Sequence, residues 1–324
     1  MNPNFRHHLL KITSASECKE LELIQSLWSG YGNISRYGLV NGTHETVVVK
    51  HIALGKTKVH PRGWNSSNSH NRKVRSYEVE THWYEHWNKR CNAACKTPKF
   101  LGSYSVENNR WIILEDLDKV FPLRKTQVTF SEVKNCLSWL AHFHAEFLDE
   151  SPAGLWPVGT YWHLETRPDE LERIEHEELK SKAHHLDMAL NDCTYKTLVH
   201  GDAKLANFCF SEDGRKVAAV DFQYVGGGCG IKDVAYFLGS CLSSSECELF
   251  EEELLKYYFS ELRIAVELRT DGLDISALEN EWRELYPVAC TDFMRFMLGW
   301  MPSHQKVNNY NLKMMKAVLN KIEL

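Results

Sequence analysis

Two short apolar segments, residues 197–200 and 216–222, interrupt a half of the chain whose hydrophobic residues otherwise recur with helical spacing. The first segment leads to Asp202 and, five residues later, to Asn207, and the second contains Asp221. An ionised carboxylate beside an apolar strand is costly to bury unless it is paired or bound to a metal. The pattern therefore predicts two short strands that carry a polar loop, which is the first candidate for a functional site.

Asp202, Asn207 and Asp221 are the residue types that phosphoryl transfer from ATP requires. This reaction needs a positioned nucleophile, neutralised phosphate charge and Mg²⁺ held by oxygen ligands. We expect Asp202 to orient an acceptor hydroxyl and take its proton, and Asn207 and Asp221 to ligate the metal. The alternative is that Asp202 and Asn207 only make the side-chain-to-backbone bonds of a turn. The combination of three such residues favours the catalytic interpretation.

The length of 324 residues exceeds the size at which one hydrophobic core keeps growing, so two lobes or domains are expected. The ordinary composition and the formal net charge of -5 give no sign of nucleic-acid or membrane-surface binding. Ten cysteines without a Cys-x-x-Cys pair favour reduced thiols. With no signal-peptide core and no apolar run of membrane-spanning length, we expect a cytoplasmic protein without membrane insertion, and no obligatory protein partner is evident.

The N-terminal third is predicted to form an antiparallel sheet. Residues 21–51 consist of extended runs separated by turns, and Asn41-Gly42 is a hairpin signal because both residues tolerate positive φ. Residues 100–104 and 111–117 are predicted to be two further strands, the second of which ends the first lobe.

A polar stretch at residues 55–71 predicts a long loop, and the amphipathic pattern at 72–89 predicts a helix that packs on the sheet. The expected architecture is α+β, with residues 1–117 as a lobe of antiparallel sheet and one main helix, and residues 118–324 as a larger, mostly helical lobe. The helices expected in the second lobe span residues 130–147, 168–190, 245–268, 275–298 and 312–322.

The His-Gly-Asp motif that ends at Asp202, with Asn207, and the Val-Asp-Phe motif around Asp221 resemble motifs of the aminoglycoside phosphotransferase and choline kinase group. These enzymes are small-molecule relatives of protein kinases. Within the group, the chain is most similar to the ecdysteroid-kinase-like, or CHK-kinase-like, proteins, over about residues 21–300. The resemblance implies a protein-kinase-like two-lobe fold, ATP and Mg²⁺ as cofactors, and a small-molecule hydroxyl acceptor.

Two positions differ from the protein-kinase pattern. Gly201 stands where protein kinases carry the arginine of His-Arg-Asp, and Gln223 stands where they carry the glycine of Asp-Phe-Gly. No Ala-Pro-Glu segment follows. These departures favour a small hydroxyl-bearing acceptor over a protein substrate.

The resemblance also implies a nucleotide site in the first lobe. Lys50, at the end of the Val-Val-Val-Lys strand, matches the family's phosphate-contacting lysine, and Glu80 matches its helix partner, with Glu78 as the rival. The alternatives are a solvated strand end for Lys50 and an exposed helix charge for Glu80.

Gly30 and Gly32 lie in the turn between the first two strands, where backbone amides can approach phosphate oxygens. Ser35 replaces the third glycine of a Gly-x-Gly-x-x-Gly pattern, so a plain hairpin turn remains the alternative. Glu115 and Leu117 match the hinge whose backbone groups bind the adenine edge.

The acceptor is expected in the helical lobe, where aromatic residues are abundant. A quaternary-ammonium alcohol needs an aromatic cage, whereas a sterol-like alcohol needs an apolar slot, and the sequence does not choose between them. Asp233 is expected to brace the catalytic loop, and His144 to be a core histidine. The alternatives to a kinase are an inactive nucleotide- or ligand-binding pseudokinase and, less favoured, a protein kinase.

Overall fold

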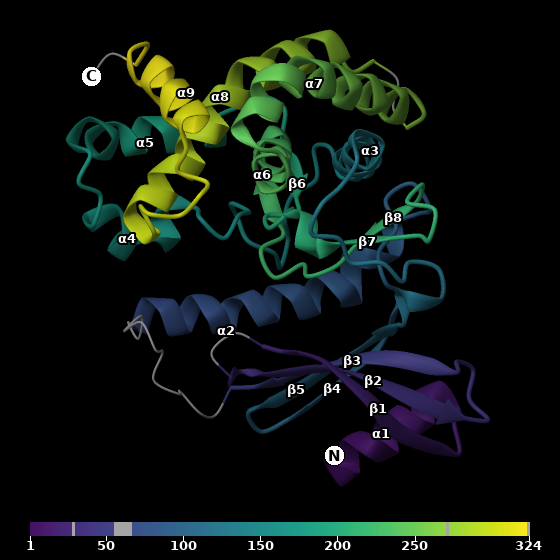
Figure 1. The fold of residues 1–324 in the computed structure, drawn as a ribbon. Helices are drawn as coiled ribbons and strands as arrows, with labels where there is room; N and C mark the ends of the chain where they lie inside the picture. The colour runs from purple at the N-terminus through teal and green to yellow at the C-terminus, as the bar shows by residue number, and fades with distance from the viewer. Residues whose placement is uncertain (28–29, 55–66, 270–271, 323–324) are drawn as a thin grey trace.

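The computed structural model describes residues 1–27, 30–54, 67–269 and 272–322. An antiparallel sheet forms one lobe and a larger set of helices forms the other, with helix α2 running along the sheet on the side of the helical lobe (Figure 1). The expected α+β class and two-lobe fold are therefore confirmed. Within the described residues, no helix combines the length and the apolar character needed to cross a membrane.

The sheet of the first lobe has the strand order β1-β2-β3-β5-β4, and all neighbouring strands are antiparallel. The predicted hairpin at Asn41 is present, because Asn41 has a φ of 55° and the Leu39 amide donates to the Glu45 carbonyl at 2.8 Å. The strands are β1 (Glu17–Ser26), β2 (Gly32–Val40), β3 (Thr46–Ala53), β4 (Phe100–Val106) and β5 (Asn109–Glu115).

The side chains of strand β3 alternate between the two faces of the sheet. Val47 and Val49 are buried in one cluster with Phe5 of α1 (Pro3–Thr13), whereas Val48 and Lys50 face the opposite side and line a cavity. The two-residue period of the strand therefore places Lys50 on the face of the sheet that lines the cavity.

Helix α1 covers the outer face of the sheet and was not predicted. The Asn2 side chain caps it by accepting hydrogen bonds from the Asn4 and Phe5 amides, and Phe5 stacks on Trp111 with ring centroids 4.9 Å apart. Packing against the sheet stabilises this helix, whose short and weakly apolar sequence does not by itself predict one.

Helix α2 spans Ser67–His82 and continues into a π turn at Trp83–Trp87 and a 3₁₀ turn at Asn88–Arg90. It begins five residues before the predicted start, so residues 67–71 of the predicted loop are helical, while residues 55–66 lie outside the described residues. Tertiary bonds hold this polar first part: His70 bonds the Tyr31 hydroxyl at 2.6 Å, and Arg72 donates to the Thr166 carbonyl at 2.7 Å. Because these contacts are polar, the sequence shows no apolar period that would predict this part of the helix.

The second lobe is mostly helical, as expected. The single helix predicted over 168–190 is wrong, because it is divided into two at residues 173–176, where His176 caps the second helix by accepting from the Leu179 amide at 3.2 Å. The helices are α3 (Phe130–Glu146), α4 (Pro168–Glu172), α5 (Glu177–Asn191), α6 (Ile231–Cys241), α7 (Ser244–Glu267), α8 (Ile275–Trp300) and α9 (Asn309–Leu319).

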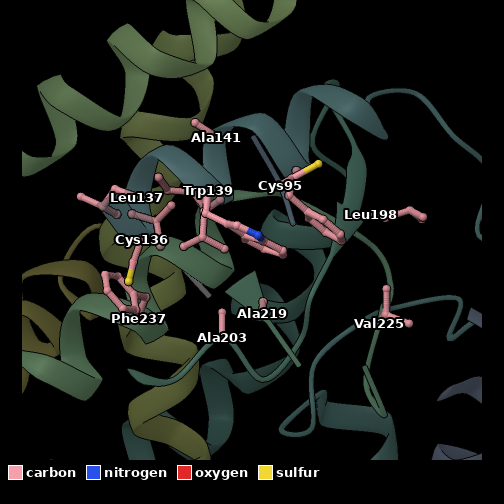
Figure 2. Packing of buried hydrophobic residues seen from close by; sticks show 14 of the residues in the cluster. Cys95, Cys136, Leu137, Trp139, Ala141, Leu198, Ala203, Ala219, Val225 and Phe237 are labelled. Atoms are coloured by element: carbon pink, nitrogen blue, oxygen red, sulfur yellow. The ribbon is translucent and has the colours of Figure 1, made fainter. Parts of the chain in front are cut away.

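The two predicted extended segments of this lobe are strands. They are β6 (Thr197–Val199), paired with β9 (Gly226–Gly228), and β8 (Val217–Ala219), paired with β7 (Phe208–Phe210). Trp139 of α3, Leu198 and Ala219 belong to the same buried core of the lobe (Figure 2), and the Trp139 indole donates to the Lys96 carbonyl at 2.9 Å. The polar loop therefore lies on a rigid apolar base.

Candidate active site

A cavity of about 1240 Å³ is lined by the sheet, by α2 and by the helical lobe. Its volume exceeds the range of roughly 300–1,000 Å³ that is common for a single small-molecule site, so it can hold two ligands together. Lys50, Glu80, Asp202, Asn207 and Asp221 all line it. The fold thus brings together five of the predicted site residues, which are separated by up to 171 positions in sequence.

Lys50 and Glu80 form a buried ion pair, with the lysine nitrogen 2.8 Å from Oε1 and 2.6 Å from Oε2. The Lys50 nitrogen also lies 3.4 Å from Oδ1 of Asp221. Burial raises the pKa of the Glu80 carboxyl to about 7, against the opposing charge of Lys50. Glu78 is exposed and lies near Arg75, 3.5 Å away, so the geometry selects Glu80 as the partner.

Asp221 has a φ of 70° and is followed by Phe222, whose ring stacks on Trp83 at 4.7 Å. This anchored ring holds the main chain next to Asp221 in place. Burial alone would raise the pKa of Asp221, but the charges of Lys50 and Lys204 lower it to about 2. Asp221 is therefore a carboxylate at all physiological pH values.

Gln223 connects Asp221 to helix α2. Its amide nitrogen donates to Oδ1 of Asp221 at 2.8 Å, and its amide oxygen accepts from Lys73 at 2.7 Å and from the Ser76 hydroxyl at 3.2 Å. Gln223 is 5% exposed, and its main-chain oxygen accepts from the Trp156 indole at 2.8 Å. The residue that departs from the protein-kinase pattern thus has a defined place between α2 and the acidic group.

Asp202 is held by three side chains. Lys204 donates to Oδ2 at 2.8 Å, Asn207 to the same oxygen at 3.1 Å, and the Tyr236 hydroxyl to Oδ1 at 3.2 Å. Burial and the carboxylate of Asp202 raise the pKa of Tyr236, which keeps its proton as a donor. Asn207 also donates to the Asp202 main-chain oxygen at 2.8 Å, so its amide oxygen is the atom that can bind a metal.

Asp233, in the first turn of α6, braces the main chain before Asp202. Its carboxylate accepts from the His200 amide at 2.6 Å and from the Gly201 amide at 2.9 Å. His144 is fully buried and bonds the same carboxylate at 3.2 Å through Nε2. The bracing bonds predicted for Asp233 and the core position predicted for His144 are both present.

The two glycines of the first turn do not line the cavity, although their described neighbours Leu27 and Tyr31 do. The Gly30 amide donates to the Leu27 carbonyl at 3.1 Å. Gly32 has a φ of 133°, and a Cβ there would lie 1.9 Å from the His51 carbonyl oxygen. The close pairing of β2 with β3 is therefore a sufficient reason for a glycine at this position.

Glu115 and Leu117 line the cavity at the segment that connects the sheet to the helical lobe. The Glu115 carboxylate is engaged by Lys96 at 2.6 Å. Arg36 of β2 holds the same segment through Asp116 at 2.7 Å.

Within the described ranges, no three His, Cys, Asp or Glu side chains lie together as a possible metal site. Magnesium, however, is usually bound by one or two carboxylates together with phosphate and water oxygens. The Asp221 carboxylate and the Asn207 amide oxygen are hard oxygen donors of this kind, so the residues present fit Mg²⁺.

Several cavity residues were not identified from the sequence. Lys204 could have been identified from the sequence, because it follows Asp202 by two residues in the same loop. Tyr236, Lys73 and Lys306 could not, because they lie on other elements and only the fold brings them to the cavity.

Residues 160–269, which contain Asp202, Asn207 and Asp221, match the model of the ecdysteroid kinase-like family. The resemblance predicted from the motifs is confirmed over this segment. No curated protein matches the chain.

Solved structures of phosphotransferases resemble the chain at low sequence identity. A microcompartment-associated aminopropanol kinase superposes with a TM-score of 0.51 and 15% identity, over 97% of this chain and 94% of that chain, which supports the kinase-like fold. A type VIII aminoglycoside-3'-phosphotransferase gives 0.46 and 16%, over 87% and 98% of the two chains. An ethanolamine kinase from Plasmodium vivax gives 0.47 and 12%, over 93% and 81%.

Proposed function

We propose that the chain is an ATP- and Mg²⁺-dependent small-molecule kinase that phosphorylates a hydroxyl group of a metabolite, sterol-like or choline-like alcohol. The observation that carries the proposal is the meeting of Asp202, Asn207 and Asp221 with the Lys50–Glu80 pair in one cavity. Each of these groups supplies a part that phosphoryl transfer requires.

The nucleotide is assigned to the lobe of residues 1–117 and the acceptor to the lobe of residues 118–324. Lys50, held by Glu80, contacts the phosphates, and main-chain groups at Glu115 and Leu117 meet the adenine edge. Support for the turn at Gly30 and Gly32 as a phosphate contact is weaker, because the Gly30 amide already donates to a main-chain oxygen.

In the proposed reaction, Asp202 accepts a hydrogen bond from the acceptor hydroxyl and takes its proton as the phosphoryl group is transferred. Lys204 and Tyr236 fix the carboxylate, and Lys204 adds positive charge beside the transferred group. Asn207 and Asp221 hold Mg²⁺, which neutralises phosphate charge when it is bound.

A pseudokinase that binds nucleotide without transfer is the second candidate. The observation that favours it is that Asp202 already accepts hydrogen bonds from Lys204, Asn207 and Tyr236, so few lone pairs are left for an acceptor. A protein kinase is less favoured, because no Ala-Pro-Glu segment follows the Asp-Phe motif.

Transfer from γ-labelled ATP to a panel of choline-like, sugar, aminoglycoside and sterol alcohols, with and without Mg²⁺, tests the proposal. Asp202→Asn should lower turnover by about 10²–10⁴-fold and leave Mg-ATP binding intact, because it removes only the proton acceptor. Asp213→Asn, an exposed aspartate outside the cavity lining, is the matched control. Tight Mg-ATP binding without transfer to any alcohol would favour the pseudokinase, and unchanged turnover in Asp202→Asn would remove Asp202 from its role.

A further inference from the structure

One wall of the cavity, next to Asp202, is aromatic. We call it the acceptor wall and define it by four rings that pack edge to face or tilted against one another at centroid distances of 5.0 to 6.3 Å. The Tyr236 hydroxyl donates to Asp202, so the wall begins at the proposed base. Its members are Tyr161, Tyr236 of α6, and Phe293 and Phe296 of α8.

Lys306, from the segment between α8 and α9, covers part of this wall. Its nitrogen lies 4.6 Å from the ring centroid of Tyr236 and 5.3 Å from that of Phe293. Both distances are within the range of cation–π attraction. Lys306 forms no ion pair within 4 Å among the described residues; the charge of Asp202 acts on it from a greater distance, and Asp202 itself pairs with Lys204 at 2.8 Å.

Arg167 covers the rest of the wall. Its guanidinium carbon lies 5.0 Å from the ring centroid of Phe296 and 5.7 Å from that of Tyr161. The residue is 8% exposed, and Glu170 holds it at 3.1 Å. Every ring of the acceptor wall therefore already has a cation of the protein near its face.

An aromatic cage recognises a quaternary ammonium group by offering it electron-rich ring faces. In this cavity Lys306 and Arg167 already occupy those faces, and a positively charged ligand placed there would also be repelled by the charge of Lys306. Repulsion between like charges is stronger in a partly enclosed cavity than in bulk water. An uncharged ligand meets neither obstacle, whereas an anionic one would face the carboxylate of Asp202 at the edge of the wall.

Building on the proposed function, we propose that the phosphorylated alcohol carries no positive charge at the end that meets the acceptor wall, and that Lys306 sets this specificity. Choline-like and other ammonium alcohols are then excluded by the cations of the protein itself. Lys306 is the more informative of the two, because it reaches the wall without a carboxylate partner, whereas the charge of Arg167 is compensated by Glu170.

Binding of matched alcohol pairs tests this inference without turnover. Each pair contains a quaternary-ammonium alcohol and its carbon isostere, such as choline with 3,3-dimethylbutan-1-ol, and a larger pair that bears a benzyl group in place of one methyl. Affinities are measured by ligand-observed NMR titration of the full chain with Mg-ADP present. The unmodified chain should prefer the uncharged member of each pair.

Lys306→Met keeps the length and apolar stem of the side chain and removes its charge. It should raise the affinity for the ammonium member by about 10-fold relative to the uncharged one, because the two ring faces become available. Lys306→Arg keeps the charge and should keep the preference. Lys313→Met makes the same change at an exposed lysine of α9 outside the cavity lining and should have no effect.

The inference is overturned if the unmodified chain binds the ammonium member as well as its isostere, or if Lys306→Met leaves the ratio unchanged. It also fails if neither member of any pair binds, because the wall is then not an acceptor site. Failure of the proposed function is a different result: no transfer from labelled ATP to any alcohol, while the binding ratio still responds to Lys306→Met.

Discussion

Replacing Gln223 by methionine removes the amide that connects Asp221 to α2 and leaves a side chain of similar length. The bond to the Asp221 carboxylate at 2.8 Å and the bond from Lys73 at 2.7 Å are lost together. Hydrogen bonds to charged groups contribute roughly 1.5–3 kcal/mol each, but Lys73 is half-exposed and can turn to water. We therefore expect the free energy of unfolding to fall by about 2 kcal/mol.

The larger effect is expected on the metal. After the substitution, Asp221 keeps Lys50 at 3.4 Å as a weaker partner, and its carboxylate can rotate. Loss of a group that orients a metal ligand typically costs about 10–100-fold in metal affinity or activity. We expect the Mg²⁺ concentration for half-maximal phosphoryl transfer to rise by at least about 10-fold.

The assay is transfer from labelled ATP as a function of Mg²⁺, together with urea unfolding without metal. Ser76→Ala is the matched control, because it removes the 3.2 Å bond to the amide oxygen of Gln223 and leaves the bond to Asp221. It should cost under about 1 kcal/mol and leave the Mg²⁺ requirement unchanged. If Gln223→Met lowers stability but does not change the Mg²⁺ requirement, Gln223 only packs between α2 and the loop and the reasoning is refuted.

Two further predictions concern charged groups of the cavity. Lys50→Met leaves Glu80 buried without its partner, so urea unfolding should show a loss of about 3 kcal/mol, and adding Glu80→Gln should recover part of it; no recovery would show that the pair is not the cause. Burial lowers the pKa of Lys306 to about 8, so its charge is present below that pH and lost above it. Discrimination against ammonium alcohols should therefore weaken from pH 7 to 9, and in Lys306→Met it should be independent of pH. The other titratable groups that face Lys306 are Asp202, Lys204, Tyr236 and Cys241 of α6, and His304.

The parts of the site that were predictable are those in which local pattern and chemistry coincide. The alternation along β3 places Lys50 on the face opposite Val49, and two short apolar strands place Asp202 and Asp221 in adjoining loops. Lys50 was predicted from the family resemblance, and the period of β3 accounts for the direction of its side chain. Asp202 and Asp221 were predicted from the carboxylates that follow two apolar segments.

The remaining parts depend on tertiary contacts. Glu78 and Glu80 are two residues apart on α2, and only the packing of this helix decides that Glu80 turns to Lys50 while Glu78 remains exposed. Lys306 lies about a hundred residues after the loop of Asp202, and it reaches Tyr236 only because α8 packs against α6. No local period could indicate either contact.

Gly201 has a structural reason that does not involve the choice between protein and small-molecule acceptors. Its φ is 79°, and a Cβ there would lie 2.1 Å from the Tyr224 carbonyl oxygen, so the arginine found at this place in protein kinases does not fit. The same close approach lets the Gly201 carbonyl accept from the Tyr161 amide at 3.1 Å. Tyr161 belongs to the acceptor wall, so the glycine brings that wall against the loop of Asp202. Gly201 therefore allows the aromatic surface and the loop of Asp202 to share one cavity.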